Sequence, residues 1–136
     1  MFLGQHTLKP DAKGKVTLPK GYLPFLAGGL VLTAGFDGSL VVFPEADWQA
    51  LAERVIGTAL TNGRARTLRR HLFANAVRLT PDKNGRIPLP AHLRHLAGID
   101  DQLIIIGLYN YLEIWSPRAW QNAQTETAVT WEGLPI

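Results

Sequence analysis

The sequence KPDAKGKVTLP at residues 9–19 closely matches a second stretch, TPDKNGRIPLP, at residues 80–90. In both stretches an aspartate and a glycine precede a basic residue and an apolar-x-apolar-Pro run. The two aspartates, Asp11 and Asp82, lie 71 positions apart. Such self-similarity indicates an internal repeat, in which each copy forms one supersecondary unit.

Two further segments repeat at nearly the same distance. LAG at residues 26–28 matches LAG at 96–98, an offset of 70. GFDGSLVVFPEADW at residues 35–48 matches GLYNYLEIWSPRAW at 107–120, an offset of 72. Offsets that stay between 70 and 72 indicate a duplicated supersecondary unit with one small deletion and one small insertion.

Each copy predicts the same order of elements. A strand with one apolar face follows the charged turn, because Val16 and Leu18 alternate with polar neighbours, as Ile87 and Leu89 do in the second copy. Proline then ends the strand and can begin a short helix. In the second copy this helix is AHLRHLA, with an apolar side formed by Leu93, Leu96 and Ala97; in the first copy, Gly21 and Pro24 predict a shorter or later helix.

A pair of strands around a turn comes next in both copies. The turns are Asp37-Gly38, a strong hairpin signal, and Tyr109-Asn110. A helix follows in the first copy, with its apolar side formed by Trp48, Leu51, Ala52, Val55 and Ile56. A second helix over residues 64–75 links the copies, and we expect Trp48 and the equivalent Trp120 to be core or interface anchors.

The sequence predicts one α+β, β-rich domain over residues 1–136. We expect repeat 1 at about 5–57, the linking helix at about 60–76, repeat 2 at about 77–124 and an irregular tail at 125–136. A half of roughly 55 residues is marginal alone. The two halves are therefore expected to complete one pseudo-twofold barrel in which hairpins from both copies interleave.

Charge is distributed unevenly along the chain. Residues 60–95 hold eight basic residues and one acidic residue, or +7, and the remainder holds six basic and ten acidic residues, or −4. This asymmetry indicates either a polyanionic partner on one surface or a solvated basic helix face. The arginines of the linking helix, which contact either phosphates or acidic residues of a neighbouring subunit, are Arg64, Arg66, Arg69 and Arg70.

Several function classes find no support. The chain has no cysteine, and its four histidines form no metal-binding pattern. Neither a phosphate-binding loop nor a nucleophile motif is present, so we predict no enzyme, no cofactor, no metal and no small-molecule substrate. No visible signal peptide and no apolar run of roughly 18 residues occurs, which predicts a cytoplasmic protein without a membrane partner.

The residues closely resemble the MraZ family, bacterial transcriptional regulators of the gene cluster for division and cell-wall synthesis. The resemblance covers residues 2–122. It rests on the two Asp-x-x-Gly-basic turns and on three segments in the family's order: GFDGSLVVFPEADW, LTNGRARTLRRHLF and GIDDQLIIIGLYNYLEIWSPRAW. The family's Asp-x-x-x-Arg motif matches Asp82 and Arg86 fully, whereas Lys15 stands at the arginine position of the first copy and Leu3 replaces an arginine near the start.

This resemblance implies a fold and a function. The fold is a swapped-hairpin, double-psi-like barrel of two tandem SpoVT/AbrB-type motifs with flanking helices. Proteins of this kind assemble into ring-like homo-oligomers, associate with the nucleoid, and bind double-stranded DNA at short G-rich direct repeats upstream of their own operon. We expect each charged turn to join two strands of a basic β-hairpin, and these hairpins to bind the DNA. The alternative is an antitoxin-like protein of the same fold that binds a protein partner.

The turns themselves contain the candidate DNA-binding residues. The aspartates, the glycines and Asn84 have a structural explanation, because Asn-Gly favours a tight turn and aspartate can accept backbone hydrogen bonds two residues on. The basic residues are not needed for the turn, and an arginine on a two-stranded ribbon fits the guanine edge in the major groove. We therefore predict DNA contacts from Lys13, Lys15, Lys83 and Arg86, with turn-forming or orienting roles for Asp11, Gly14, Asp82, Asn84 and Gly85. Lys15, which lacks a planar fork, is expected mainly to bind phosphate.

Overall fold

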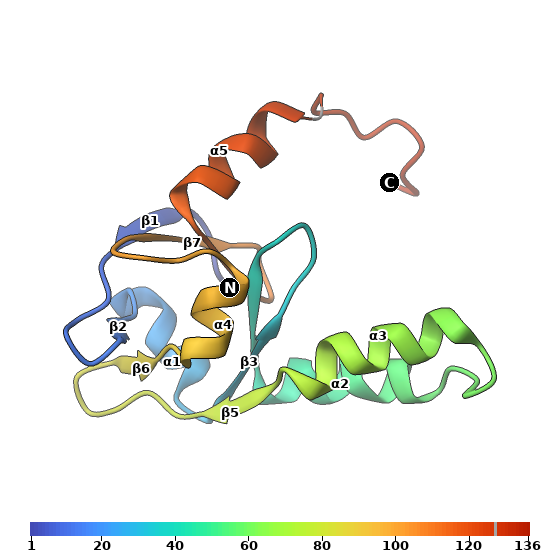
Figure 1. The fold of residues 1–136 in the computed structure, drawn as a ribbon, viewed down its shortest axis with the longest axis horizontal. Coiled ribbons are helices and arrows are strands. Elements are labelled where there is room, and N and C mark those ends of the chain that lie inside the picture. Colours follow the sequence, from blue (N-terminus) through green and yellow to red (C-terminus); the bar gives the residue numbers. More distant parts are fainter. Residues whose placement is uncertain (127) are drawn as a thin grey trace.

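The structure, a computed structural model, describes residues 1–126 and 128–136, and it is α+β with most of its strands in one antiparallel sheet (Figure 1). The first copy contains β1 (Gln5–Leu8), β2 (Lys15–Thr17), the 3-10 helix η1 (Lys20–Tyr22), α1 (Leu23–Leu26), β3 (Leu30–Ala34), β4 (Leu40–Pro44) and α2 (Glu45–Ile56). The second contains β5 (Val77–Leu79), β6 (Arg86–Pro88), α4 (Ala91–Leu96), β7 (Leu103–Gly107), β8 (Leu112–Trp115) and α5 (Pro117–Glu126). Between the copies lies α3 (Gly63–Ala74).

The two copies interleave their strands. The main sheet has the order β1-β7-β8-β4-β3-β5, so β1 of the first copy pairs with a hairpin of the second, and β5 of the second copy pairs with a hairpin of the first. The remaining strands, β2 and β6, pair antiparallel with each other, one from each copy. This exchange confirms the predicted swapped-hairpin, barrel-like fold. In the described residues the strands form two separate sheets rather than one closed ring of hydrogen bonds.

One hydrophobic core lies between the sheet and the β2·β6 ribbon. Strand alternation turns Val16 and Ile87 of the ribbon inward, where they are 1% and 0% exposed. They join Leu18 and Leu89 and the inward side chains of the sheet in a single cluster, as the strand pattern predicts. Because both copies contribute to this core, neither copy has a complete core of its own.

The hairpins predicted around residues 37–38 and 109–110 and the predicted helices form, but two residues expected on the apolar sides of helices are exposed. At the β3–β4 turn, Asp37 and Gly38 both have positive φ, and the Ser39 N–H donates to the Phe36 carbonyl, which is a type I′ turn. The predicted short helix of the first copy is η1 with α1. Leu96, expected on the apolar side of α4, is instead 44% exposed, because α4 ends at this residue and the core is already covered by Leu93. Ile56, the last residue of α2, is also exposed.

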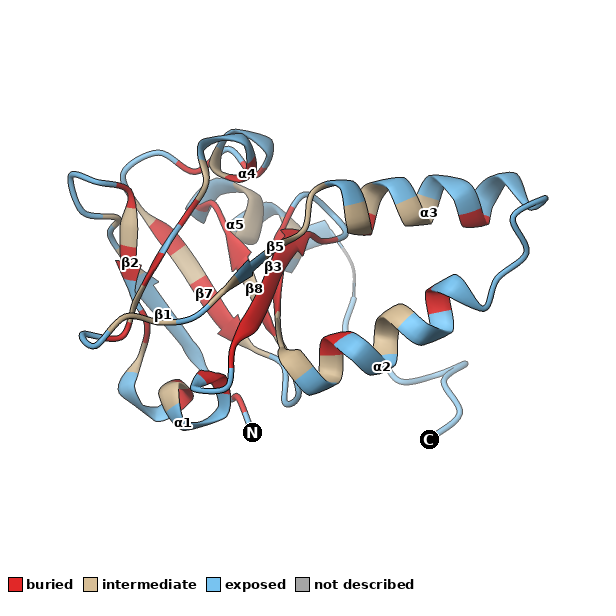
Figure 2. Ribbon diagram, turned by 90° about the horizontal axis from the view of Figure 1, so that it is seen from below, coloured by how far each residue is buried: buried red, intermediate tan, exposed pale blue. Residues whose placement is uncertain are grey.

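Helices α2 and α3 form an arm that projects from the barrel (Figure 2). A second, smaller core lies between these helices and the sheet, built from Val31 of β3, Trp48 and Val55 of α2, and Leu72 of α3. In Figures 1 and 2 the tip of this arm lies at the opposite end of the molecule from the β2·β6 ribbon. α5 continues to Glu126, two residues into the predicted irregular tail, and Thr127 lies outside the described residues. None of the helices in the described part of the chain is long and apolar enough to span a membrane.

Candidate nucleic-acid interface

The outward face of the β2·β6 ribbon has two basic side chains. Strand alternation points Val16 and Ile87 into the core, so Lys15 and Arg86 necessarily point outward. In the register, Lys15 lies opposite Pro88 and Arg86 lies opposite Thr17, which places the two cations diagonally on one face. Their side chains are 39% and 37% exposed.

A charged turn precedes each strand of the ribbon, and the two turns have the same hydrogen bonds. Asp11 Oδ1 accepts from the N–H groups of Lys13 and Lys15 at 2.9 Å each. In the second turn, Asp82 Oδ1 accepts from Asn84 and Arg86 at the same distance. Each aspartate therefore holds the backbone of its own turn, and the glycine that follows takes positive φ, +79° at Gly14 and +74° at Gly85.

Two expectations about these turns were wrong. They do not join the two strands of a β-hairpin, because β1 pairs with β7 and β5 with β3, while β2 and β6 pair with each other. The ribbon is therefore made between the copies. Nor is the second turn of the Asn-Gly kind: Gly85 has positive φ, whereas Asn84 does not, and the Asn84 N–H donates to Asp82 instead.

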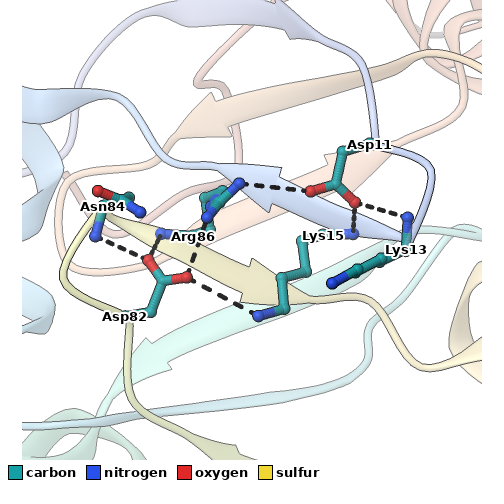
Figure 3. A network of polar contacts seen from close by, with 6 residues as sticks. All are labelled: Asp11, Lys13, Lys15, Asp82, Asn84 and Arg86. Atoms are coloured by element: carbon teal, nitrogen blue, oxygen red, sulfur yellow. Dashed lines mark hydrogen bonds and ion pairs between the residues drawn. The ribbon is translucent and has the colours of Figure 1, made fainter.

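The aspartates also contact the basic side chains of the opposite turn (Figure 3). Lys15 Nζ lies 3.8 Å from Asp82 Oδ2, and Arg86 Nη1 lies 3.7 Å from Asp11 Oδ2. Arg86 Nε lies 3.5 Å from Asp82 Oδ2, but this nitrogen is buried and its geometry makes no hydrogen bond within the described residues. The guanidinium is thus held between two carboxylates by long ion pairs rather than by short hydrogen bonds.

Such contacts orient Arg86 without immobilising it. Ion pairs between partly exposed side chains contribute little free energy, because water and salt screen them. An incoming acceptor of stronger geometry, such as a guanine edge or a phosphate, can therefore displace them. Lys13 and Lys83, at the tips of the two turns, are exposed.

Both aspartates are ionised over the whole physiological range. Backbone hydrogen bonds lower their pKa values, chiefly the Lys15 N–H at Asp11 and the Arg86 N–H at Asp82. Because the ionised form accepts these bonds, the stabilisation that they give is complete above about pH 4 and is lost as the pH falls further. The hydrogen bonds to the aspartates therefore hold both turns at neutral pH.

Arg94 of α4 is a basic residue that the sequence analysis did not assign to the turns. A Cβ placed on Gly14 would lie 3.1 Å from Arg94 Nη1, so this guanidinium lies directly against the first turn. Its Nη2 donates to the Asp100 carbonyl at 3.1 Å. Sequence spacing gave no sign of this position, because residues 14 and 94 belong to different copies.

The arginines of α3 lie elsewhere. Arg66 donates to the Leu60 carbonyl at 2.9 Å, and Arg69 donates to the carbonyls of Ile56 and Thr58 at 2.9 and 2.6 Å. These two arginines brace the loop between α2 and α3, while Arg64 and Arg70 are exposed. The basic window of residues 60–95 therefore does not form one surface: part of it lies on the arm and part at the ribbon (Figure 1).

Among the described residues, no group of three or more histidine or acidic side chains could hold a metal ion. Arg78, also in the basic window, forms a bidentate pair with Glu45, with Arg78 Nη2 2.6 Å from Glu45 Oε1. This pair joins β5 to the start of α2, so Arg78 has a structural partner of its own. The basic residues of this window that lie at the ribbon and its turns are Lys83, Arg86 and Arg94.

Comparison with known proteins agrees with the duplication. The model of the family described as "MraZ protein, putative antitoxin-like" matches twice, at residues 1–71 and 72–130. A protein of Saccharopolyspora erythraea named "Transcriptional regulator MraZ" is 44% identical over 122 residues, which is 90% of this chain and 85% of the relative. Proteins with the same name are 44% identical in Herpetosiphon aurantiacus and 43% identical in Corynebacterium glutamicum, the latter over 93% of this chain and 89% of the relative.

Proposed function

The chain belongs to the MraZ family, and from this premise we propose that it is a sequence-specific DNA-binding regulator of transcription. Its targets are short G-rich direct repeats upstream of its own operon, within the gene cluster for division and cell-wall synthesis. It acts at the nucleoid in the cytoplasm. Relatives named as regulators also point away from an enzyme.

The observation that supports this function best is the outward face of the β2·β6 ribbon. Two copies of one turn meet there, and both place basic side chains on the same solvent-facing surface. Val16 and Ile87 close the core beneath, so the cations lie outside it. A rigid, two-stranded element with cations on its outer face matches the width of the DNA major groove.

The basic side chains differ in the DNA contacts that their chemistry allows. Arg86 has a planar fork that can bridge O6 and N7 of one guanine, and the flanking aspartates keep that fork aligned. Lys15 has a single ammonium group, which suits a phosphate or one acceptor. Lys13 and Lys83 at the turn tips reach the sugar-phosphate backbone.

One guanine contact gives weak selectivity, so we propose that several subunits act together. A bidentate arginine–guanine pair discriminates by about 1–3 kcal/mol. In a ring-like homo-oligomer, successive subunits engage successive repeats, and the linkage multiplies weak affinities. The exposed Arg64 and Arg70 of the arm are available for phosphates or for acidic residues of a neighbouring subunit. The ring itself is tested by light scattering, where a monomer at micromolar concentration would contradict it.

The antitoxin-like alternative fits this chain less well. A toxin-binding protein of this kind needs a free segment after a single motif to wrap its partner. Here the family model matches a second time over residues 72–130, and the strands of that second motif complete the barrel of the first.

The test compares two single substitutions that each remove one positive charge from the ribbon. Arg86→Ala should lower affinity for a duplex of evenly spaced G-rich repeats by about tenfold or more for each engaged subunit, and it should abolish preference over a scrambled duplex. Lys15→Ala should mainly reduce the slope of log K against log salt, by about one for each engaged subunit. Fluorescence anisotropy over a salt series measures both quantities.

The matched control is Arg54→Ala, which removes one exposed positive charge from α2, away from the turns. It should bind both duplexes nearly as the wild type does. If Arg86→Ala keeps wild-type affinity and preference, the ribbon is not the DNA-reading surface.

A further inference from the structure

Leu23 and Arg94 occupy equivalent places in the two copies, 71 positions apart like Asp11 and Asp82. Each covers the turn glycine of the other copy. A Cβ on Gly85 would lie 2.8 Å from Leu23 Cδ1, and a Cβ on Gly14 would lie 3.1 Å from Arg94 Nη1. The duplication thus places one helix residue over each turn, but the chemistry of the two residues differs.

Leu23 has a packing role, because it is partly buried and packs against the main core. Arg94 is half-exposed, and one nitrogen of its fork donates to the Asp100 carbonyl. Arg86 contacts two carboxylates, whereas in the described part of the chain no carboxylate lies within ion-pair distance of Arg94. Its positive charge is consequently not neutralised by a partner.

The position of this charge compensates for a difference between the turns. The second turn has its guanidinium on the ribbon, at Arg86, while the first turn has only Lys13 and Lys15. Arg94 brings a guanidinium to the first turn from the helix of the other copy. With it, each turn has one arginine, and the first turn has the larger positive charge.

We propose that Arg94 is a further DNA-binding residue, which contacts the sugar-phosphate backbone beside the first turn. This inference rests on the proposed function of the ribbon. A phosphate is the expected contact because Arg94 lies at the side of the turn, against Gly14, and is tied to the Asp100 carbonyl rather than placed on the outward face of the ribbon. A charge in that position strengthens binding to any duplex without reading its sequence.

The first experiment uses Arg94→Leu, which introduces the side chain found at the equivalent position of the first copy. Binding is measured by anisotropy over a salt series, on the G-rich repeat duplex and on a scrambled duplex. We expect the slope of log K against log salt to fall by about one for each engaged subunit. Affinity at about 0.15 M salt should fall roughly fivefold per engaged subunit, equally on both duplexes.

Two more variants separate charge from structure. Arg94→Gln removes the charge but retains an N–H donor for the Asp100 carbonyl, so it should reproduce the reduced slope even if Arg94→Leu folds poorly. Arg94→Lys retains the charge and should keep a slope close to that of the wild type. Thermal unfolding of each variant shows whether the fold is preserved.

Two results would overturn the inference: a wild-type slope in a folded Arg94→Gln protein, or a loss of preference between the duplexes without a change in slope. If the wild type binds and Arg86→Ala weakens it while Arg94→Gln has no effect, only this inference fails. If the wild type binds neither duplex, the proposed function itself fails.

Discussion

The first turn, at Asp11, and the second turn, at Asp82, have the same backbone conformation but different side chains. Asp11 and Asp82 accept the same pair of N–H groups, and Gly14 and Gly85 take nearly the same φ. Around this shared frame the cation on the ribbon is lysine in one turn and arginine in the other. The residue over the glycine is arginine in one and leucine in the other. The two copies therefore agree in what the backbone of the turn needs and differ in the side chains placed around it.

The two copies also differ in the helices that follow their hairpins, α2 after β3–β4 and α5 after β7–β8. Trp48 of α2 is 8% exposed, since α3 packs over it and Phe73 contacts its ring. The equivalent Trp120 of α5 is only half-buried, against Trp115 and with its Nε1 donating to Gln5. In the described residues no helix after α5 plays the part of α3. The sequence expectation of an anchoring tryptophan thus describes Trp48 better than Trp120.

Replacing each tryptophan in turn gives the largest expected difference between the copies. Trp48→Ala should lower the free energy of unfolding by about 3–5 kcal/mol, because it opens a cavity in the smaller core. Trp120→Ala should lower it by about 1 kcal/mol, as for a partly exposed side chain. Urea unfolding at low protein concentration measures both, and equal losses would mean that α5 is as firmly packed as α2.

The turn glycines give an intermediate difference. Alanine at either position must adopt positive φ, which costs about 1–2 kcal/mol. Gly85→Ala should cost about 1 kcal/mol more than Gly14→Ala, because its Cβ would meet the core-packed Leu23, whereas the Cβ on residue 14 meets the flexible end of Arg94. Thermal unfolding of the two variants tests this order, and the reverse order would contradict the assignment of Leu23 and Arg94 as covers.

The smallest effect is expected at Glu113, in the centre of the sheet. Its partner on the neighbouring strand is Val41, which is also the equivalent residue of the first copy. Burial raises the pKa of the Glu113 carboxyl, and the charge of Asp37 adds to this, while the Trp115 N–H opposes it. Ionisation of Glu113 therefore favours the unfolded state at neutral pH. Glu113→Gln, which can still accept from Trp115, should raise the melting temperature slightly at pH 7.

The pH dependence of that effect provides its control. As the pH is lowered toward the ordinary pKa of glutamate, Glu113 becomes protonated in the folded protein first. The difference in melting temperature between the wild type and Glu113→Gln should then shrink and disappear. A difference that stays constant from pH 7 to about pH 4 would show that it does not come from the charge.

Much of the fold was predictable because it depends on local patterns. Val16, Leu18, Ile87 and Leu89 alternate along short strands, and the Asp37-Gly38 pair forms its type I′ turn where the sequence indicates. Leu96 could not be predicted, because its exposure depends on where α4 ends relative to a core that Leu93 already covers. Arg94 could not be placed at the first turn for the same kind of reason: the contact joins residues 14 and 94.

By itself the sequence determined the duplication, the two aspartate–glycine turns and the inward face of the ribbon strands, because each of these follows from spacing along one segment. Only the tertiary structure decided that β2 and β6 pair with each other rather than within a hairpin, that the basic window divides between the arm and the ribbon, and that Arg94 lies at the first turn. The physical reason is that neither copy can bury its apolar face alone. The strands of the two copies must exchange partners to close one core, and this exchange brings distant residues together.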